Sequence, residues 1–246
     1  MMEPIRSRHN ELVKRMIALG SDGKARQALG EYLCAGQTLL EEARASGAEI
    51  TCVLTTELLD GLPCRLVTPE ILKAVSPLQN SPGPVFTVKM KPLPAAETLA
   101  RVIVLENVQD PGNVGTVLRT ADAFGMDLVV LCGACADPYN PKTVRASMGA
   151  VFRQSTVKCD LPELPDILRG LPLYGAALRP GGVDVRDLPE GPLAVAIGNE
   201  GQGLSAALLD MCQGSTIIPM RPQAESLNAG VAAAVVMWEM YRKWLD

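Results

Sequence analysis

The sequence predicts an α/β protein with two modules, the second built on a mainly parallel sheet. Two observations lead to this prediction. The chain has 246 residues, which exceeds the ~100 to 200 residues typical of one domain. Beyond residue 100, short apolar runs rich in Val, Ile and Leu are separated by segments with helical patterning. Such runs suit strands that are covered on both faces.

A proline-rich stretch, residues 76–97, marks the boundary between the modules. Prolines exclude regular helix and disfavour interior strands. The stretch contains Pro77, Pro82, Pro84, Pro92 and Pro94. We therefore expect a small N-terminal α/β domain over residues 1–90 and a larger domain over residues 99–246.

The spacing of apolar residues predicts the elements of both domains. In the first we expect helices over 10–19 and 38–45, and strands over 49–56, 64–68 and 85–89. In the second we expect strands over 101–108, 128–132, 172–178, 192–198 and 215–220, and helices over 114–124, 161–169, 205–211 and 227–245. The last helix carries a one-sided apolar stripe, which needs a partner surface. The stripe consists of Leu227, Val231, Ala234, Val235, Trp238 and Tyr241.

The composition is that of a globular protein. Hydrophobic residues make up 48% and charged residues 20% of the chain, which argues against a disordered protein. The N-terminus carries charges where a signal peptide needs an apolar core, and no uncharged apolar run approaches the ~18 to 20 residues of a membrane span. We therefore expect a cytoplasmic protein with no membrane partner.

The overall charge of −4 does not predict a polyanion partner, because nucleic-acid binders usually carry a basic surface. Two local groups of basic residues depart from this average. Residues 1–26 hold six basic side chains against three acidic ones. A second group contains no acidic residue and consists of Lys142, Arg145, Arg153 and Lys158. Each group is either a solvated face or a binding surface.

The seven cysteines are an odd number scattered through apolar segments, which predicts reduced thiols and not a disulfide framework. Cys132 and Cys135 form the one CxxC pair. A zinc or redox site there would need further ligands, and the single histidine, His9, is far away in the sequence. We expect a strand end followed by a turn, and no metal site.

Three loop segments, which lead into predicted helices or overlap their starts, follow predicted strands: residues 106–125, the sequence GNEGQG at 198–203, and the sequence SLNAGVA at 226–232. In open parallel sheets ligands bind beyond the carboxyl ends of the strands. The glycines of GNEGQG allow backbone amides to approach a ligand closely, although a tight turn capped by Ser205 would need the same residues. Their spacing is not GxGxxG, which disfavours a nucleotide-dependent oxidoreductase. Glu200 would repel a phosphate, so it either suits a ligand with positive charge or hydroxyl donors or caps a helix.

The polar residues of these loops each allow two interpretations. Asn113, Ser226 and Asn228 are good helix caps and equally good amide or hydroxyl groups for a site. Arg119 interrupts an apolar helix, so its side chain either extends along the surface to water or binds an anion.

Taken together, the three loops resemble the motifs of the SpoU or TrmH family of RNA ribose 2′-O-methyltransferases, within the SPOUT superfamily. The resemblance covers residues 101–246, and residues 144–153 are similar to the segment between the first two family motifs. It implies a C-terminal SPOUT domain with a trefoil knot, a homodimer, and a smaller N-terminal domain that binds the substrate. It also implies S-adenosylmethionine as cofactor, held by Gly198, Ile218 and Leu227, with Ile197, Gly203 and Met220 as further neighbours.

The activity that the resemblance implies is methyl transfer to a ribose 2′-hydroxyl of structured RNA, with ribosomal RNA preferred to transfer RNA. Arg119 would anchor a phosphate and stabilise the developing alkoxide across a subunit interface. The identity of the base stays open, because a guanidinium rarely gives up its proton. The other implied site residues are Asn113, Glu200, Ser226 and Asn228. The candidates for holding RNA are Arg6, Arg8, Lys14, Arg15 and Arg145. The alternative is an RNA-binding homodimer of the same fold without turnover.

Overall fold

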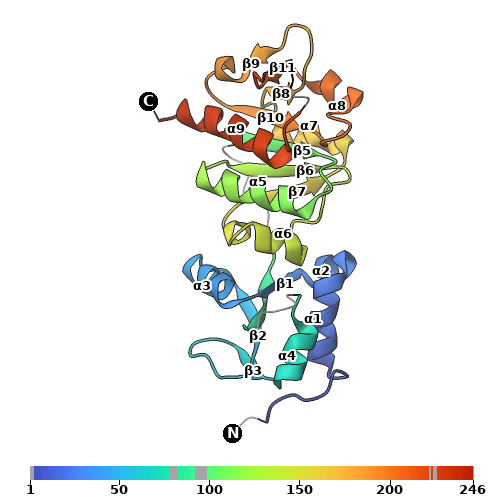
Figure 1. Cartoon of the computed structure of the whole chain (residues 1–246), viewed down its shortest axis with the longest axis vertical. Coiled ribbons are helices and arrows are strands. Elements are labelled where there is room, and N and C mark those ends of the chain that lie inside the picture. Colours follow the sequence, from blue (N-terminus) through green and yellow to red (C-terminus); the bar gives the residue numbers. More distant parts are fainter. Residues whose placement is uncertain (1–2, 78–82, 92–98, 222, 224–225, 246) are drawn as a thin grey trace. The chain divides into compact units, whose positions relative to one another are not determined.

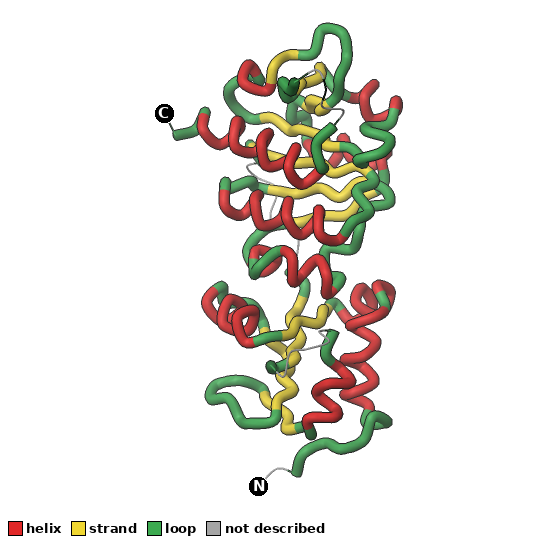
Figure 2. Tube along the Cα trace, in the orientation of Figure 1, coloured by secondary structure: helices red, strands yellow, loops and turns green. Residues whose placement is uncertain are grey.

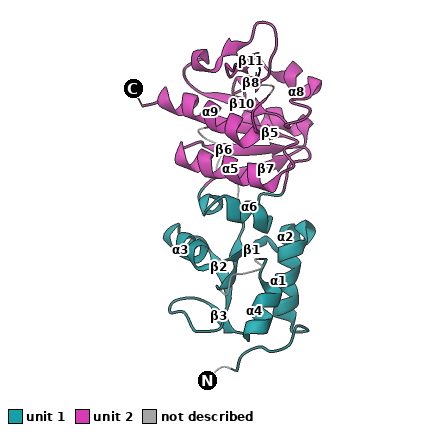
Figure 3. Ribbon diagram, viewed as in Figure 1, with its two compact units in different colours: residues 1–92, 137–153 teal, residues 93–136, 154–246 magenta. Residues whose placement is uncertain are grey.

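The computed structural model describes residues 3–77, 83–91, 99–221, 223 and 226–245. It divides into two compact units (Figure 3). The first contains Met1–Pro92 and Asp137–Arg153, and the second contains Leu93–Ala136 and Gln154–Asp246. Residues 137–153 therefore group with the first unit, although the sequence-based boundaries place them in the second. The expected proline-rich boundary lies partly outside the described residues.

The first unit is a four-stranded sheet with helices (Figures 1 and 2). Its strands lie in the order β1-β4-β2-β3, with β2 and β3 parallel and the other pairs antiparallel. The strands are β1 (Glu31–Ala35), β2 (Ile50–Thr55), β3 (Cys64–Leu66) and β4 (Val85–Lys89). The helices are α1 (Glu11–Ser21), α2 (Gly23–Leu29), α3 (Gln37–Ala45), α4 (Pro69–Val75) and α6 (Pro141–Ala146), with the 3₁₀ turn η2 (Ala150–Phe152).

The segment 137–153 joins this unit through its apolar side chains. Val144, Val151 and Phe152 are buried in one cluster with Tyr32 and Phe86 of the sheet. A buried ion pair adds to this contact, because Arg26, which is 3% exposed, lies 2.7 Å from the carboxylate of Asp137. Arg26 also donates to the carbonyl of Leu19. A buried guanidinium needs such partners, so this arginine serves the fold and not a ligand.

The second unit is a seven-stranded sheet in the order β7-β6-β5-β10-β8-β11-β9, and every neighbouring pair is parallel. This confirms the predicted parallel sheet. The strands are β5 (Arg101–Glu106), β6 (Leu128–Cys132), β7 (Thr156–Cys159), β8 (Leu173–Ala176), β9 (Val183–Asp184), β10 (Leu193–Ile197) and β11 (Gly214–Ile217). The helices are α5 (Pro111–Ala123), α7 (Leu164–Leu168), α8 (Ala206–Met211) and α9 (Ala229–Arg242), with the 3₁₀ turns η3 (Leu161–Glu163) and η4 (Val185–Asp187).

Both faces of this sheet are covered, as the apolar runs predict. Alternate residues of each strand point to opposite faces. Ile103 and Leu105 of β5 pack in one cluster with residues of α5 and α9, whereas Val102 and Val104 pack in another with residues of α7 and α8. Figure 1 shows α5 and α9 side by side on one face. No helix of the described residues is long and apolar enough to cross a membrane.

Helix α9 is apolar on two faces. Its buried residues are Ala229, Gly230, Ala233, Val236, Met237 and Met240. The stripe that the sequence indicates is a different face, on which Val231 and Trp238 are 48% and 44% exposed. Helix α9 contains a glycine, Gly230, at a position where a larger residue would be crowded. A Cβ there would stand 3.3 Å from Cγ2 of Thr116 in α5. The glycine thus permits close approach of α9 to α5.

Candidate active site

The loop that follows β10 doubles back on itself at Gly198. The N–H of Gly203 donates to the carbonyl of Asn199 at 2.8 Å, and the two residues form an isolated bridge. A Cβ on Gly198 would lie 2.2 Å from the carbonyl carbon of Gly203. Real Cβ atoms do not approach backbone so closely, so residue 198 must be glycine. Gly203 itself has φ of 68°, in the left-handed region that favours glycine.

Asn199 organises the interior of this loop. Its Oδ1 accepts from the N–H of Gly201 at 2.8 Å and from that of Gln202 at 3.3 Å. Its Nδ2 donates to the carbonyl of Asn107 at 3.1 Å, which ties the loop to the residue after β5. Asn107 is itself unusual, with φ of 55°. Such strained positions recur at functional sites.

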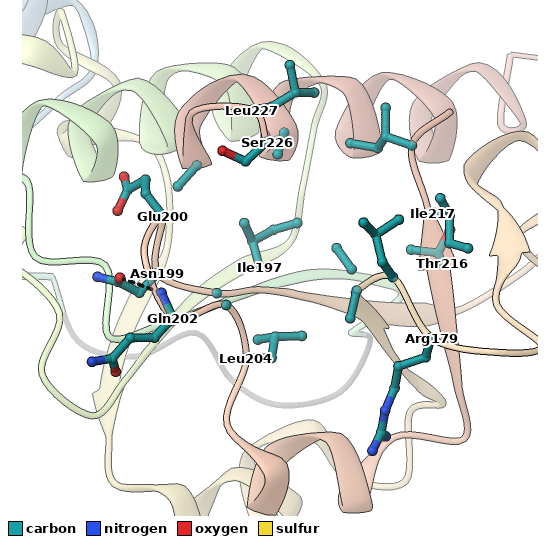
Figure 4. Close-up of a pocket in the computed structure, with 18 of the residues that line it drawn as sticks. Arg179, Ile197, Asn199, Glu200, Gln202, Leu204, Thr216, Ile217, Ser226 and Leu227 are labelled. Carbon is teal, nitrogen blue, oxygen red and sulfur yellow. Dashed lines mark hydrogen bonds between the residues drawn. The ribbon is translucent and has the colours of Figure 1, made fainter. Parts of the chain in front are cut away.

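Beside this loop lies a pocket of about 380 Å³. Its walls come from the ends of β8, β10 and β11 and from the start of α9, which is where the strand-end rule predicts a ligand. Figure 4 shows apolar side chains around the cavity, with Glu200 and Arg179 on opposite sides. All six residues that the sequence analysis assigned to the cofactor line it: Ile197, Gly198, Gly203, Ile218, Met220 and Leu227.

Two of the predicted catalytic residues, Glu200 and Ser226, also line the pocket. Asn113 and Asn228 do not line it but connect to it. Nδ2 of Asn113 makes a short hydrogen bond to Oε1 of Glu200, and Nδ2 of Asn228 donates to Oδ1 of Asn113 at 2.9 Å. The fold thus brings one residue from each of the three loops into a single hydrogen-bonded chain.

The donor direction of this chain follows from helix capping. Oδ1 of Asn228 accepts from the N–H groups of Gly230 and Val231 at the start of α9. Its amide nitrogen must therefore point to Asn113, whose own amide nitrogen then points to Glu200. The capping interpretation of Asn228 is therefore confirmed, because its amide oxygen caps α9, while its amide nitrogen donates to Asn113. Its role in a site stays a prediction.

Arg119 lies elsewhere. It is exposed on α5 and is not among the described residues that line the pocket. The described chain therefore does not bring this guanidinium to the cofactor residues. The family resemblance implies that Arg119 acts across a subunit interface, and this role stays a prediction.

The five basic residues expected to bind RNA all belong to the first unit, including Arg145, which lies in the last turn of α6. Arg6, Arg8 and Arg145 are exposed. The other two are paired, Lys14 with Glu11 at 2.8 Å and Arg15 with Glu31 at 2.6 Å.

Sequence reasoning missed several residues of the site. Arg179 is the one basic side chain among the described residues that line the pocket, and Gln202 lines the pocket on the other side. Both follow strands that were predicted, so the strand-end rule could have indicated them. Glu106 and Ser205, which support the loop, carry no comparable signal because their contact joins residues 99 positions apart.

The CxxC pair is a strand end and a turn, as expected. Cys132 ends β6, and Sγ of Cys135 donates to the carbonyl of Leu105 at 3.2 Å. Burial raises the pKa of Cys135 to about 11, so its thiol is protonated at neutral pH. The described residues contain no group of three or more side chains that could hold a metal ion.

The pocket fits a ligand that joins an apolar ring to a cationic centre. Leu204, Ile217 and Leu227 supply apolar walls, and the glycines leave backbone groups within reach of a polar ring edge. Glu200 places a carboxylate on one side. A purine joined to a sulfonium has these properties.

Comparison with known proteins decides the family. The model of the SpoU rRNA methylase family matches residues 100–238. The chain belongs to the SpoU rRNA methylase family. The family match spans α5, the loop after β10 and most of α9, so it includes all three loops of the site.

Relatives within the SpoU family match along almost the whole chain. The chain is 34% identical to the 23S rRNA (guanosine(2553)-2′-O)-methyltransferase RlmP of Bacillus subtilis, over 97% of this chain and 99% of that protein. It is 30% identical to the 23S rRNA (uridine(2479)-2′-O)-methyltransferase of Streptomyces viridochromogenes, over 97% and 93% of the two chains. The crystal structure of an AdoMet-bound rRNA methyltransferase from Sinorhizobium meliloti is similar, with a TM-score of 0.87, 26% identity, and coverage of 100% of this chain and 99% of that one.

Proposed function

We propose that this chain transfers a methyl group from S-adenosylmethionine to a ribose 2′-hydroxyl of ribosomal RNA. The observation that carries the proposal is the hydrogen-bonded chain from Asn228 through Asn113 to Glu200, which ends at the rim of an apolar pocket. Membership of the SpoU family supports the chemistry, and the two relatives named as 23S rRNA 2′-O-methyltransferases support ribosomal RNA as substrate.

The pocket would hold the cofactor through its apolar walls and its loop backbone. Ile197, Ile218 and Leu227 would cover the adenine ring, and Gly198 and Gly203 would present backbone groups to it. When bound, S-adenosylmethionine supplies an electrophilic methyl group on a positively charged sulfur. The carboxylate of Glu200 favours positive charge at that side of the pocket.

The polar chain would orient the ribose. Asn113 holds one oxygen of Glu200, which leaves the carboxylate with a fixed direction and further acceptor capacity for a hydroxyl proton. Ser226 lines the same pocket and can accept or donate. Alignment of attacking oxygen and methyl group is a large part of the catalysis of such displacements.

Arg119 would come from a second copy of the chain, in a homodimer. Two observations support this part of the proposal. Arg119 is exposed and lies outside the pocket of its own chain, and α9 presents an apolar face that includes the exposed Val231 and Trp238. Exposed apolar faces of this kind mark interaction sites, and a two-fold interface presents the same face twice. At the active site the guanidinium would stabilise charge on the attacking oxygen.

The trefoil knot belongs to the same proposal. Strand β10 lies between β5 and β8, and β11 lies beyond β8, so late segments of the chain return to the middle of the sheet. The tight loop at Gly198 and the segment after β11 both line the pocket. A knot at this place would hold the cofactor residues of both segments together.

The first unit would bind the RNA. Aromatic residues are 4% of the chain, so recognition would depend on the shape of the RNA, its phosphates and the 2′-hydroxyl more than on base stacking. The exposed Arg6, Arg8 and Arg145 are the basic residues best placed for phosphate contacts, because none of them forms an ion pair within the described residues.

A transfer assay tests the proposal. Purified protein, cofactor with a labelled methyl group, and unmodified ribosomal or transfer RNA are incubated in parallel. The proposal predicts label in ribosomal RNA at a single nucleotide. Label in transfer RNA alone would correct the substrate, and cofactor binding without transfer to either RNA would favour the non-catalytic RNA-binding protein.

A further inference from the structure

Glu106 is a buried carboxylate at the edge of the active site. It is the last residue of β5 and is 4% exposed. A buried charge is costly unless hydrogen bonds compensate it. We therefore expect hydrogen-bond donors around the carboxylate of Glu106.

Glu106 binds both donors of a single residue, Ser205. Its Oε2 accepts from the backbone N–H of Ser205 at 2.7 Å, and its Oε1 accepts from the Ser205 hydroxyl at 2.6 Å. The hydroxyl accepts from the N–H of Leu208 at 3.1 Å, so its own proton must point to the carboxylate. Both bonds involve a charged acceptor, which is the stronger class of hydrogen bond.

Ser205 ends the loop that lines the pocket. The lining residues Gly203 and Leu204 come directly before it. The beginning of the same loop is held by Asn107, the residue after Glu106, whose carbonyl accepts from the side chain of Asn199. Two consecutive residues at the end of β5 thus hold the two ends of the loop.

We propose that Glu106 is a positioning residue for methyl transfer: by holding Ser205, its carboxylate fixes the exit of the loop 199–204 in the shape that binds S-adenosylmethionine. This inference rests on the proposed function. Glu106 does not line the pocket and acts through the loop. A carboxylate suits this place because Ser205 offers two donors, and two acceptor oxygens receive them.

The variant Glu106→Gln tests the proposal, because an amide accepts with its oxygen but turns an NH₂ group toward the second donor. We expect the Kd for S-adenosylmethionine, measured by calorimetry on the purified full chain, to rise about tenfold or more. The KM for the cofactor should rise similarly, whereas kcat at saturating cofactor should fall by less than about threefold.

Asp127→Asn is the matched control. Asp127 is also a carboxylate of the second unit that accepts from two N–H groups, those of Ala100 and Arg101 at 2.8 and 2.7 Å. These bonds lie at the opposite end of β5, away from the pocket. This variant should lower the melting temperature and leave the Kd for the cofactor unchanged. A merely structural role for Glu106 predicts that the two variants behave alike.

If Glu106→Gln does not fold, Ser205→Ala provides a second test of the proposal. It removes one of the two bonds and retains the backbone N–H, so we expect a rise in Kd of about fivefold. A folded Glu106→Gln with wild-type Kd overturns the positioning role, and so does Ser205→Ala with wild-type Kd. Failure of the wild-type chain to bind the cofactor would instead contradict the proposed function.

Discussion

Nδ2 of Asn228 lies 2.9 Å from Oδ1 of Asn113, although 115 positions separate the two residues. The contact joins the start of α9 to the first turn of α5. Because Asn113 also bonds to Glu200, this pair determines the direction in which the carboxylate of Glu200 faces the pocket.

Replacement of Asn113 by Asp should reduce turnover. The new carboxylate would face Glu200, and two like charges at hydrogen-bond distance repel. We expect kcat to fall by about tenfold to a hundredfold, the effect of ~1.4 to 2.7 kcal/mol. Asn10→Asp is the control, because Asp caps helices as well as Asn does and Asn10 caps α1 of the first unit. A wild-type kcat in Asn113→Asp would show that turnover does not depend on the hydrogen bonds among Asn228, Asn113 and Glu200.

Arg119→Lys should lose most of its turnover with little change in cofactor affinity. Lysine keeps the positive charge but loses the planar fork of donors. Arg186→Lys is the comparison, because Arg186 is an exposed arginine of the same unit that forms an ion pair with Asp184 and does not line the pocket. Single-turnover kinetics and calorimetry separate the two effects. An Arg119→Lys variant as fast as the wild type would exclude the assigned role.

Gly198→Ala should abolish cofactor binding, because the added Cβ would stand 2.2 Å from backbone that cannot move without opening the loop. Gly201→Ala is the matched control in the same loop. Its Cβ would meet nothing closer than Oδ1 of Asn199 at 3.4 Å, an ordinary contact. Calorimetry with S-adenosylmethionine checks both variants, and equal affinity of the two would contradict the tight loop geometry.

Val231→Glu should dissociate the proposed homodimer. The side chain is 48% exposed on the second apolar face of α9, and two charges at a two-fold interface would be brought together. Leu58→Glu, on a side chain that is 61% exposed in the first unit, should leave the assembly intact. Sedimentation velocity measures both. A wild-type chain that sediments as a monomer would refute this part of the proposal outright.

Stability should fall at alkaline pH because of buried thiols. Burial raises the pKa of Cys135 to about 11 and that of Cys159 to about 12, against an unfolded value of ~8.5. Above that value the unfolded chain releases these protons and the folded chain keeps them, so the free energy of unfolding decreases from about pH 9 to 12. Below pH 8 the free energy of unfolding should not depend on these thiols. Denaturant titrations across this range, compared with Cys135→Ala, measure the effect.

Much of the second unit could be predicted from the sequence, because its strands are continuous apolar runs. The run Leu128–Cys132 corresponds to β6 residue for residue, and the expected helix 205–211 corresponds closely to α8. Strands such as β9, with two residues, lack the length that a periodicity needs. Helix α6 also escaped prediction, because its six residues carry few apolar positions.

The grouping of 137–153 with the first unit was not predictable from local pattern. Val144 and Phe152 pack with the sheet formed by residues far away in sequence, and a boundary drawn from composition cannot show this. The six residues expected to hold the cofactor line one pocket, and the family resemblance had added their positions to the strand-end rule; their role in binding stays a prediction. The connection of Asn113 with Glu200 and Asn228 needs the fold, since no spacing in the sequence indicates which amide meets which partner.

The most direct test of the central claim is alkaline hydrolysis of ribosomal RNA after incubation with the protein and S-adenosylmethionine. A methyl group on a ribose 2′-oxygen prevents cleavage of the following phosphodiester bond. We expect one new resistant position with the wild-type chain and none with Gly198→Ala. If the RNA receives a methyl group and every phosphodiester bond is still cleaved, the methyl group lies on a base. That result would contradict methylation of a ribose 2′-hydroxyl.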